Sequence, residues 1–238
     1  MYLSIVIPAY NEESRIVRTI ENTLAYLNKQ SYQSEILVIS DGSTDRTKHI
    51  VENGFKPGRK VAIKAYEYHP NRGKGYAVRF GMLKSSGEHI MFMDADYSVP
   101  VEEIEKGLKL LRHGADIAIG SRTIYGAVVL VHQNFFRQLS AKIYTFIQNC
   151  YLGIPYKDTQ CGFKVFKSQA AKKLFQEQRL DSVIFDQEIL WLAKKYGLKV
   201  MEFPVRWRHV EGSRIVYDSL KKSLFVFQEL FRIKKVHR

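Results

Sequence analysis

Short apolar runs alternate with longer amphipathic stretches through the first half of the chain. Asn11 is a candidate N-cap for the first helical stretch, in which Ile20, Leu24 and Leu27 share one face. Alternation of this kind predicts an α/β fold, with helices on both faces of a mostly parallel central sheet. The predicted strands are Leu3–Ile7, Glu35–Ser40, Val61–Tyr66, His89–Met93 and Asp116–Gly120, and the further helices are Gly75–Ser85 and Glu102–Arg112.

The second half of the chain is less regular. Apolar residues recur at helical spacing between Phe135 and Cys150 and again between Leu220 and Phe231, which predicts two amphipathic helices. Without a repeat or a linker-like segment, we expect one domain over residues 1–217 and a basic amphipathic helix over residues 218–238. The other elements predicted here are strands at Phe163–Phe166 and Val200–Val205 and helices at Gln169–Gln178 and Asp186–Lys195.

Three clusters of polar or turn-forming residues directly follow predicted strands. They are Pro8-Ala9-Tyr10, Asp41-Gly42-Ser43 and Asp94-Ala95-Asp96. In open parallel sheets, ligands bind beyond the carboxyl ends of the strands. We therefore expect the three clusters to meet at one edge of the sheet and to form a ligand site.

Asp94 and Asp96 end an apolar strand with two carboxylates, which point to the same side if the segment is extended. Like charges this close repel each other, so a cation is expected beside them. Two carboxylates that leave room for substrate phosphates and water suit Mg²⁺ or Mn²⁺. The alternative is a solvated turn in which one Asp caps a helix, and the triplet alone does not decide between the two.

Two other motifs also suggest ligand contacts. Asp41 could accept hydrogen bonds from a ligand, because Gly42 allows a tight turn after the strand, although a strand–turn–helix cap would use the same residues. Arg72 and Lys74 lie between glycines at the start of a predicted helix, where backbone N–H groups favour anions. A solvated loop is the alternative, and the spacing matches neither a P-loop nor a dinucleotide-binding motif.

The charge balance adds candidate partners. The 238 residues include 37 Lys and Arg against 24 Asp and Glu, a net charge of +13. Such a chain favours nucleic acid, an anionic membrane surface or a phosphorylated substrate. The excess is uneven, since residues 206–238 hold nine Lys and Arg against three Asp and Glu, while residues 127–157 hold no acid. A basic nucleic-acid-binding protein is therefore an alternative, although we find no nucleic-acid recognition motif.

The expected cellular location follows from the cysteines and from the hydropathy. Cys150 and Cys161 have no metal-binding spacing and fit a reducing compartment. The N-terminal apolar run is too short for a signal peptide, and no window approaches the roughly 18 apolar residues of a membrane span. We therefore expect a cytoplasmic location, peripheral on the cytoplasmic face of a membrane.

Five motifs, in their order along the chain, resemble those of the family 2 glycosyltransferases of GT-A fold, whose sheet is Rossmann-like. They are IVIPAYNEESRI, ISDGSTD, NRGKGYAVRFGM, MDADYS and IGSR. The resemblance spans Leu3 to about Tyr217 and is greatest to polyprenyl-phosphate sugar transferases. Within these, DTQCGFKVFK and FDQEIL are similar to segments of the dolichyl-phosphate β-glucosyltransferases, and the dolichyl-phosphate mannose synthases are the next most similar group.

The resemblance implies roles for residues at matching positions. Asp94 and Asp96, with Ala95 between them, would hold Mg²⁺ or Mn²⁺ on the donor diphosphate. Some relatives supply a further ligand where this chain has Ser98, a poorer one, while the segment around Gln160 points to glucose as the sugar. The residues that would line the nucleotide base and ribose are Pro8, Ala9, Tyr10, Asn11, Glu12 and Asp41.

The activity that the resemblance implies is metal-dependent, inverting transfer of glucose from UDP-glucose to a polyprenyl (dolichyl) phosphate. Arg122, Arg206 and Arg214 are candidates for binding phosphate, because guanidinium groups suit oxyanions. A lipid phosphate is largely ionised at neutral pH and needs no base. If the acceptor is instead a glycan hydroxyl, Asp186 is the candidate base, with helix capping as its alternative role. GDP-mannose stays open as an alternative donor.

The two amphipathic stretches fit a lipid acceptor. Basic amphipathic helices are attracted to anionic membrane surfaces and can lie in their interface. Periodicity alone equally predicts helices that pack their apolar faces on the core. A peripheral membrane protein without catalytic activity is the remaining alternative.

Overall fold

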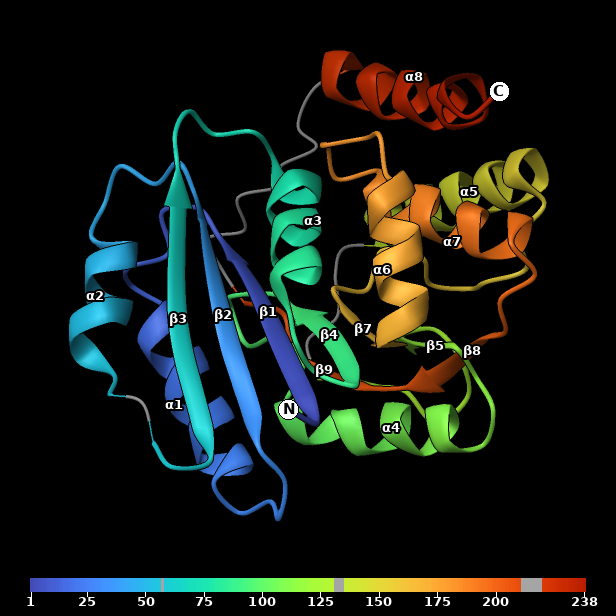
Figure 1. The fold of residues 1–238 in the computed structure, drawn as a ribbon. Helices are drawn as coiled ribbons and strands as arrows, with labels where there is room; N and C mark the ends of the chain where they lie inside the picture. Colours follow the sequence, from blue (N-terminus) through green and yellow to red (C-terminus); the bar gives the residue numbers. More distant parts are fainter. Residues whose placement is uncertain (57, 131–134, 211–219) are drawn as a thin grey trace.

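The computed structural model describes residues 1–56, 58–130, 135–210 and 220–238. Figure 1 shows its strands and helices in the order of the chain. The strands are β1 (Leu3–Ala9), β2 (Ser34–Asp41), β3 (Val61–Tyr68), β4 (His89–Met93), β5 (Ile117–Ser121), β6 (Val128–Val129), β7 (Phe163–Lys167), β8 (Val200–Pro204) and β9 (Arg206–Trp207). The helices are α1 (Ile16–Leu27), α2 (Thr47–Gly54), α3 (Lys74–Lys84), α4 (Ile104–Arg112), α5 (Phe135–Leu152), α6 (Ser168–Glu177), α7 (Phe185–Lys195) and α8 (Leu220–Val236), with a short 3₁₀ helix, Val101–Glu103, before α4.

Seven strands form the central sheet, in the order β3-β2-β1-β4-β7-β5-β8. Neighbouring strands are parallel except at β7, which runs antiparallel to both β4 and β5. β6 and β9 form a separate two-stranded ribbon. The mostly parallel α/β sheet expected from the sequence is therefore confirmed.

Helices cover both faces of this sheet, as predicted. The inner strands are buried on both sides, which explains why β1 and β4 are almost continuously apolar. One core lies under α1, α2 and α4 and includes Ile20, Val51 and Leu108. The other core lies under α3, α6 and α7, with residues such as Val78 and Leu190.

The start of the first helix differs from the prediction. Asn11 does not cap it, because α1 begins at Ile16 and Asn11 has a positive φ of 53°. The Asn11 side chain instead accepts a hydrogen bond from the Thr44 N–H at 2.8 Å, and the Glu12 N–H donates to Thr47 Oγ1 at 2.8 Å. These bonds tie the loop after β1 to the loop after β2, so the polar residues that suggested a cap join two loops.

The last helix packs on the second core through Val226, Leu230 and Ile233, while Leu224 and Phe231 are exposed. In helix α5, Ile143 and Phe146 are exposed, while Gln148 and Leu152 are buried. No helix within the described residues is long and apolar enough to cross a membrane. The boundary expected at residue 217 lies outside the described residues and stays a prediction.

Candidate active site

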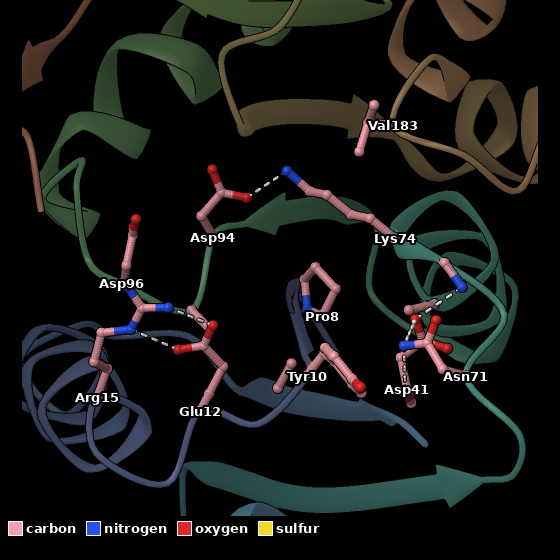
Figure 2. Close-up of a pocket in the computed structure, with 14 residues that line it drawn as sticks. Pro8, Tyr10, Glu12, Arg15, Asp41, Asn71, Lys74, Asp94, Asp96 and Val183 are labelled. Carbon is pink, nitrogen blue, oxygen red and sulfur yellow. Dashed lines mark hydrogen bonds and ion pairs between the residues drawn. The ribbon is translucent and has the colours of Figure 1, made fainter. Parts of the chain in front are cut away.

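A cavity of about 270 Å³ opens at the carboxyl ends of β1, β2 and β4. The three clusters that follow these strands therefore meet at one edge of the sheet, as expected. Figure 2 draws the residues that line the cavity and labels most of them. The lining residues predicted from the sequence are Pro8, Ala9, Tyr10, Glu12, Asp41, Lys74, Asp94, Ala95 and Asp96, and the others are Arg15, Asn71, Gly73, Ala77 and Val183.

Asp94 is held at the end of β4 by two neighbours. Its N–H donates to the Gly162 carbonyl at 3.1 Å, and its Oδ1 accepts a hydrogen bond from Lys74 Nζ at 2.6 Å (Figure 2). A Cβ added at Gly162 would lie 2.1 Å from Asp94 Oδ2, so only glycine leaves space for this carboxylate. Burial alone would lower the pKa of Lys74, but the charges of Asp94, Asp186 and Asp96 outweigh it and raise that pKa.

Asp96 is half-buried, and its Oδ1 accepts a hydrogen bond from the Ser98 N–H at 2.9 Å. Burial raises the pKa of Asp96, and the negative charge of Asp94 raises it further. A raised pKa is expected where two carboxylates repel each other in a site that lacks enough positive charge. Ser98 thus orients Asp96 through its backbone.

The chemistry of these donors fits a hard divalent cation. In the described part of the chain, no three His, Cys, Asp or Glu side chains gather as a metal-binding group. A metal at Asp94 and Asp96 would therefore take its other ligands from substrate phosphates and water, which is the usual arrangement for Mg²⁺.

Glu12 holds Arg15 at the cavity. The two side chains form a bidentate pair, with Nε–Oε2 and Nη2–Oε1 distances of 2.7 and 2.6 Å (Figure 2). The hydrogen bond with Glu12 raises the pKa of Arg15, and Asp96 and Asp94 add to this shift through their charges. A permanent cation therefore lies near the two aspartates.

Asp41 is engaged by the loop that precedes α3. Its carboxylate accepts hydrogen bonds from Asn71 Nδ2 at 3.0 Å, from the Arg72 N–H at 2.8 Å and from the Gly73 N–H at 2.9 Å. Gly42, with a φ of +66°, allows the close approach of this loop. Asp41 therefore fixes the loop that carries Lys74, and a contact from Asp41 to a ligand stays a prediction.

Several predicted site residues lie outside the cavity lining. The Arg72 guanidinium stacks on the Tyr76 ring, with its central carbon 3.6 Å from the centroid. Arg122 pairs with Asp158, with an Nε–Oδ2 distance of 2.7 Å. The other predicted residues outside the lining are Asn11, Gln160, which lies in the turn before β7, and Arg206, which pairs with Glu103 at 2.6 Å. Arg214 lies outside the described residues, so its place stays a prediction.

Asp186 is part of a buried ion pair. Lys164 Nζ donates to Asp186 Oδ1 at 2.5 Å and to the Cys161 carbonyl at 2.7 Å, and the Lys164 side chain is fully buried. Burial raises the pKa of Asp186, although Lys164 partly offsets the shift. Asp186 makes no capping hydrogen bond at the start of α7, so the capping role considered from the sequence is wrong.

Several lining residues were not singled out from the sequence. Val183 reaches the cavity from the segment before α7, more than a hundred residues after β1. Arg15 lies within the motif IVIPAYNEESRI, but charged stretches of this kind are common on protein surfaces, so it was not singled out. Asn71 begins the motif NRGKGYAVRFGM, and its place beside Arg72 and Lys74 could have indicated it.

The chain matches known families over most of its length. Residues 4–175 match the model of glycosyl transferase family 2. A dolichyl-phosphate beta-glucosyltransferase of Trichomonas vaginalis is 34% identical over 100% of this chain and 74% of its own length. Proteins of the same name from Drosophila melanogaster and Homo sapiens are 35% and 34% identical, each over 90% of this chain and 69% of their own length.

Solved structures share the fold at low sequence identity. Glucosyl-3-phosphoglycerate synthase from Mycobacterium tuberculosis, in complex with Mn²⁺ and UDP-glucose, has a TM-score of 0.66 at 16% identity, covering 98% of this chain and 77% of that chain. TarS 1-349 of S. aureus, in complex with UDP-GlcNAc, has a TM-score of 0.63 at 19% identity, over 98% of this chain and 66% of that chain. At these identities the structures support the GT-A fold alone. From the family match and the identity to its relatives, we conclude that the chain is a glycosyltransferase of family 2.

Proposed function

We propose that this glycosyltransferase transfers glucose from UDP-glucose to a dolichyl-type polyprenyl phosphate, with inversion at the anomeric carbon. The observation that carries the proposal is the pair of carboxylates, Asp94 and Asp96, at a cavity that also holds Lys74 and Arg15. The acceptor and the sugar are supported by the names of the relatives, which are dolichyl-phosphate beta-glucosyltransferases. UDP-glucose is the donor that transfer of glucose by such relatives suggests, and it is part of the proposal.

The donor would lie along the edge of the sheet. Pro8, Ala9 and Tyr10 offer an apolar and aromatic surface at the end of β1 for the base and ribose. Lys74 and Arg15 lie near the two aspartates and provide positive charge for the diphosphate. A Mg²⁺ or Mn²⁺ ion held by Asp94 and Asp96 would offset the negative charge that develops on the leaving UDP.

The transfer itself is a displacement. An acceptor phosphate oxygen forms the new bond to the anomeric carbon while the bond from that carbon to the diphosphate oxygen breaks, and UDP leaves. An ionised phosphate needs no base, which agrees with the pairing of Asp186 by Lys164. We assign the acceptor phosphate to Arg122, because Asp158 holds its guanidinium in place at 2.7 Å while the side chain stays partly exposed, whereas Arg206 is mostly exposed beside Glu103.

A lipid acceptor also accounts for the exposed apolar residues on α5 and α8. Ile143 and Phe146 on α5 and Leu224 and Phe231 on α8 are all about half exposed or more. Helix α8 is linked to the cavity, since Glu229 accepts a hydrogen bond from Ser182 Oγ at 3.0 Å, next to the lining residue Val183. We propose that this apolar face rests on the cytoplasmic surface of an anionic membrane, with exposed Arg232 and Lys235 near the headgroups.

The test of the function is transfer to a short polyprenyl phosphate, followed by mass spectrometry. With Asp94→Asn, turnover should fall at least about a hundredfold, because the site loses charge stabilisation in the transition state. Glu52→Gln on α2, which removes an exposed carboxylate paired with Lys48, is the matched control and should keep full turnover. Unchanged turnover in Asp94→Asn would refute the proposal.

The donor is identified by a thermal shift in the presence of Mn²⁺. A bound donor raises the melting temperature through mass action. UDP-glucose should raise it more than GDP-mannose or UDP-N-acetylglucosamine. The largest rise with GDP-mannose would instead assign the chain to mannose transfer.

A further inference from the structure

An ammonium group lies where a metal ion would bind Asp94. Lys74 Nζ is 2.6 Å from Asp94 Oδ1, and Figure 2 shows this bond at the cavity. Both side chains are largely shielded, with exposed fractions of 19% for Lys74 and 33% for Asp94. Since an ammonium group and a divalent cation seek the same carboxylate oxygens, Lys74 competes with a metal ion for Asp94.

The backbone on either side of Lys74 is fixed. The Gly73 N–H donates to Asp41 Oδ2 at 2.9 Å, and the Gly75 N–H donates to the Asp181 carbonyl at 2.8 Å. A Cβ at Gly73 would lie 2.6 Å from the Asp181 oxygen, so the backbone here packs closely against Asp181. The long flexible stem of Lys74 is therefore the part that can move, and its ammonium group can swing while the loop stays in place.

The local charges favour replacement of the Lys74 ammonium group by a metal ion at Asp94. Asp186 is paired with Lys164, and Glu12 is paired with Arg15. Asp94 and Asp96 together with Lys74 then leave one net negative charge at the site. A divalent cation added beside an unmoved Lys74 would reverse that sign and place two cations on one carboxylate, which is unfavourable in a shielded cavity. A nucleotide diphosphate supplies a new anionic partner for the displaced ammonium.

We propose that Lys74 is an exchangeable counter-ion, which neutralises Asp94 when no metal is bound and moves to the donor diphosphate when a divalent cation takes its place. The inference rests on the proposed function, because it needs a nucleotide diphosphate and a metal in this cavity. It predicts that metal and nucleotide bind cooperatively, each raising the affinity for the other by the same factor. Without a nucleotide, a metal ion must displace the Lys74 ammonium group although no diphosphate is present to pair with that group. The metal ion alone therefore binds weakly.

The experiment measures Mn²⁺ binding by electron paramagnetic resonance, with and without UDP, on the full chain. For the unmodified protein we expect UDP to raise the Mn²⁺ affinity by roughly tenfold or more. In Lys74→Met, Mn²⁺ alone should bind more tightly than to the unmodified protein, and the effect of UDP should shrink. Lys74→Arg keeps the charge and should retain the coupling. Lys84→Met removes one exposed lysine from the other end of α3 and controls for net charge.

Three results would overturn the inference. UDP could leave the Mn²⁺ affinity of the unmodified protein unchanged, or Lys74→Met could bind Mn²⁺ alone no better than Lys84→Met does. In both cases, Mn²⁺ binding together with turnover of UDP-glucose would leave the proposed function standing. If no variant binds Mn²⁺ even with UDP, metal-dependent transfer fails, and the inference fails with it.

Discussion

Gly162 sets the position of the Asp94 carboxylate. Because a Cβ there would lie 2.1 Å from Asp94 Oδ2, Gly162→Ala should displace the carboxylate and lower turnover by about a hundredfold. Gly54→Ala in α2 is the control, since an added Cβ there meets nothing within 4 Å, and it should keep full turnover. Circular dichroism should show that both variants stay folded. Full turnover in folded Gly162→Ala would contradict the close contact.

Asp158 should dominate the loss of stability in acid. Burial opposes its ionisation, but Arg122 outweighs burial and holds the pKa of Asp158 below its usual value of 3.8. Its contribution is therefore fully present above that pH and is lost as the pH falls through the lower folded-state pKa. Asp158→Asn should cost about 3 kcal/mol at neutral pH, since it leaves Arg122 unpaired, and the cost should shrink towards pH 3.

Urea unfolding between pH 3 and 7 measures this effect. Asp116→Asn is the control, because Asp116 pairs with Lys167 at 3.2 Å in a more exposed position and should cost less than about 1 kcal/mol. An equal cost in both variants at every pH would show that Asp158 is not held by Arg122.

The sequence located single residues of the site where a local rule applied. Asp94 directly follows β4 and Asp41 is the last residue of β2, so their meeting at one edge could be predicted. Asn11 was misplaced because the same short polar side chain caps helices and bridges loops, and only the partner Thr44 decides between the two. Val183 and the Lys164–Asp186 pair depend on contacts between distant segments, which have no local signal.

Among the helices, α5 and α8 present apolar side chains to solvent and should bind membranes. Phe146→Ser and Leu224→Ser should each weaken binding to vesicles of phosphatidylcholine and phosphatidylserine by roughly tenfold to a hundredfold, because each removes about 1.5–3 kcal/mol of apolar burial. Tyr125→Ser changes a fully exposed aromatic residue on neither helix and is the matched control. Co-sedimentation measures the binding. Equal binding of all three variants would show that the exposed apolar residues of α5 and α8 do not contact the membrane.

The strands were easier to predict than these helices. β4 has the predicted bounds, His89–Met93. In a parallel sheet, a short apolar run that ends in polar residues is typical of a buried strand. For α8 the sequence left a core face and a membrane face as alternatives; the core face is confirmed by the buried Leu230, while the exposed Leu224 leaves the membrane face a prediction. Periodicity measures how apolar residues repeat, but it contains no information on what covers them.

The net charge of +13 predicts that binding of the whole protein to anionic membranes depends on salt. Attraction to anionic vesicles should fall steeply between ~0.1 M and ~1 M salt, where the Debye length shrinks from about 10 Å to about 3 Å. Vesicles of phosphatidylcholine alone are the control and should show little salt dependence. If the protein binds duplex DNA with an equally steep salt dependence, and this binding survives substitution of Asp94 and Asp96, the nucleic-acid alternative would be favoured.

The position of β7 has a consequence for how the protein is made. β7 is the strand that joins β4 to β5, so the sheet is two separate pieces until residues 163–167 are inserted between them. The Gly162 carbonyl that binds the Asp94 N–H arrives with the same segment. During synthesis, strands β1 to β4 can therefore assemble early. The site around Asp94 is complete only after β7 has been made, which begins 70 residues after β4 ends. We expect the active site to be among the last parts of the molecule to form.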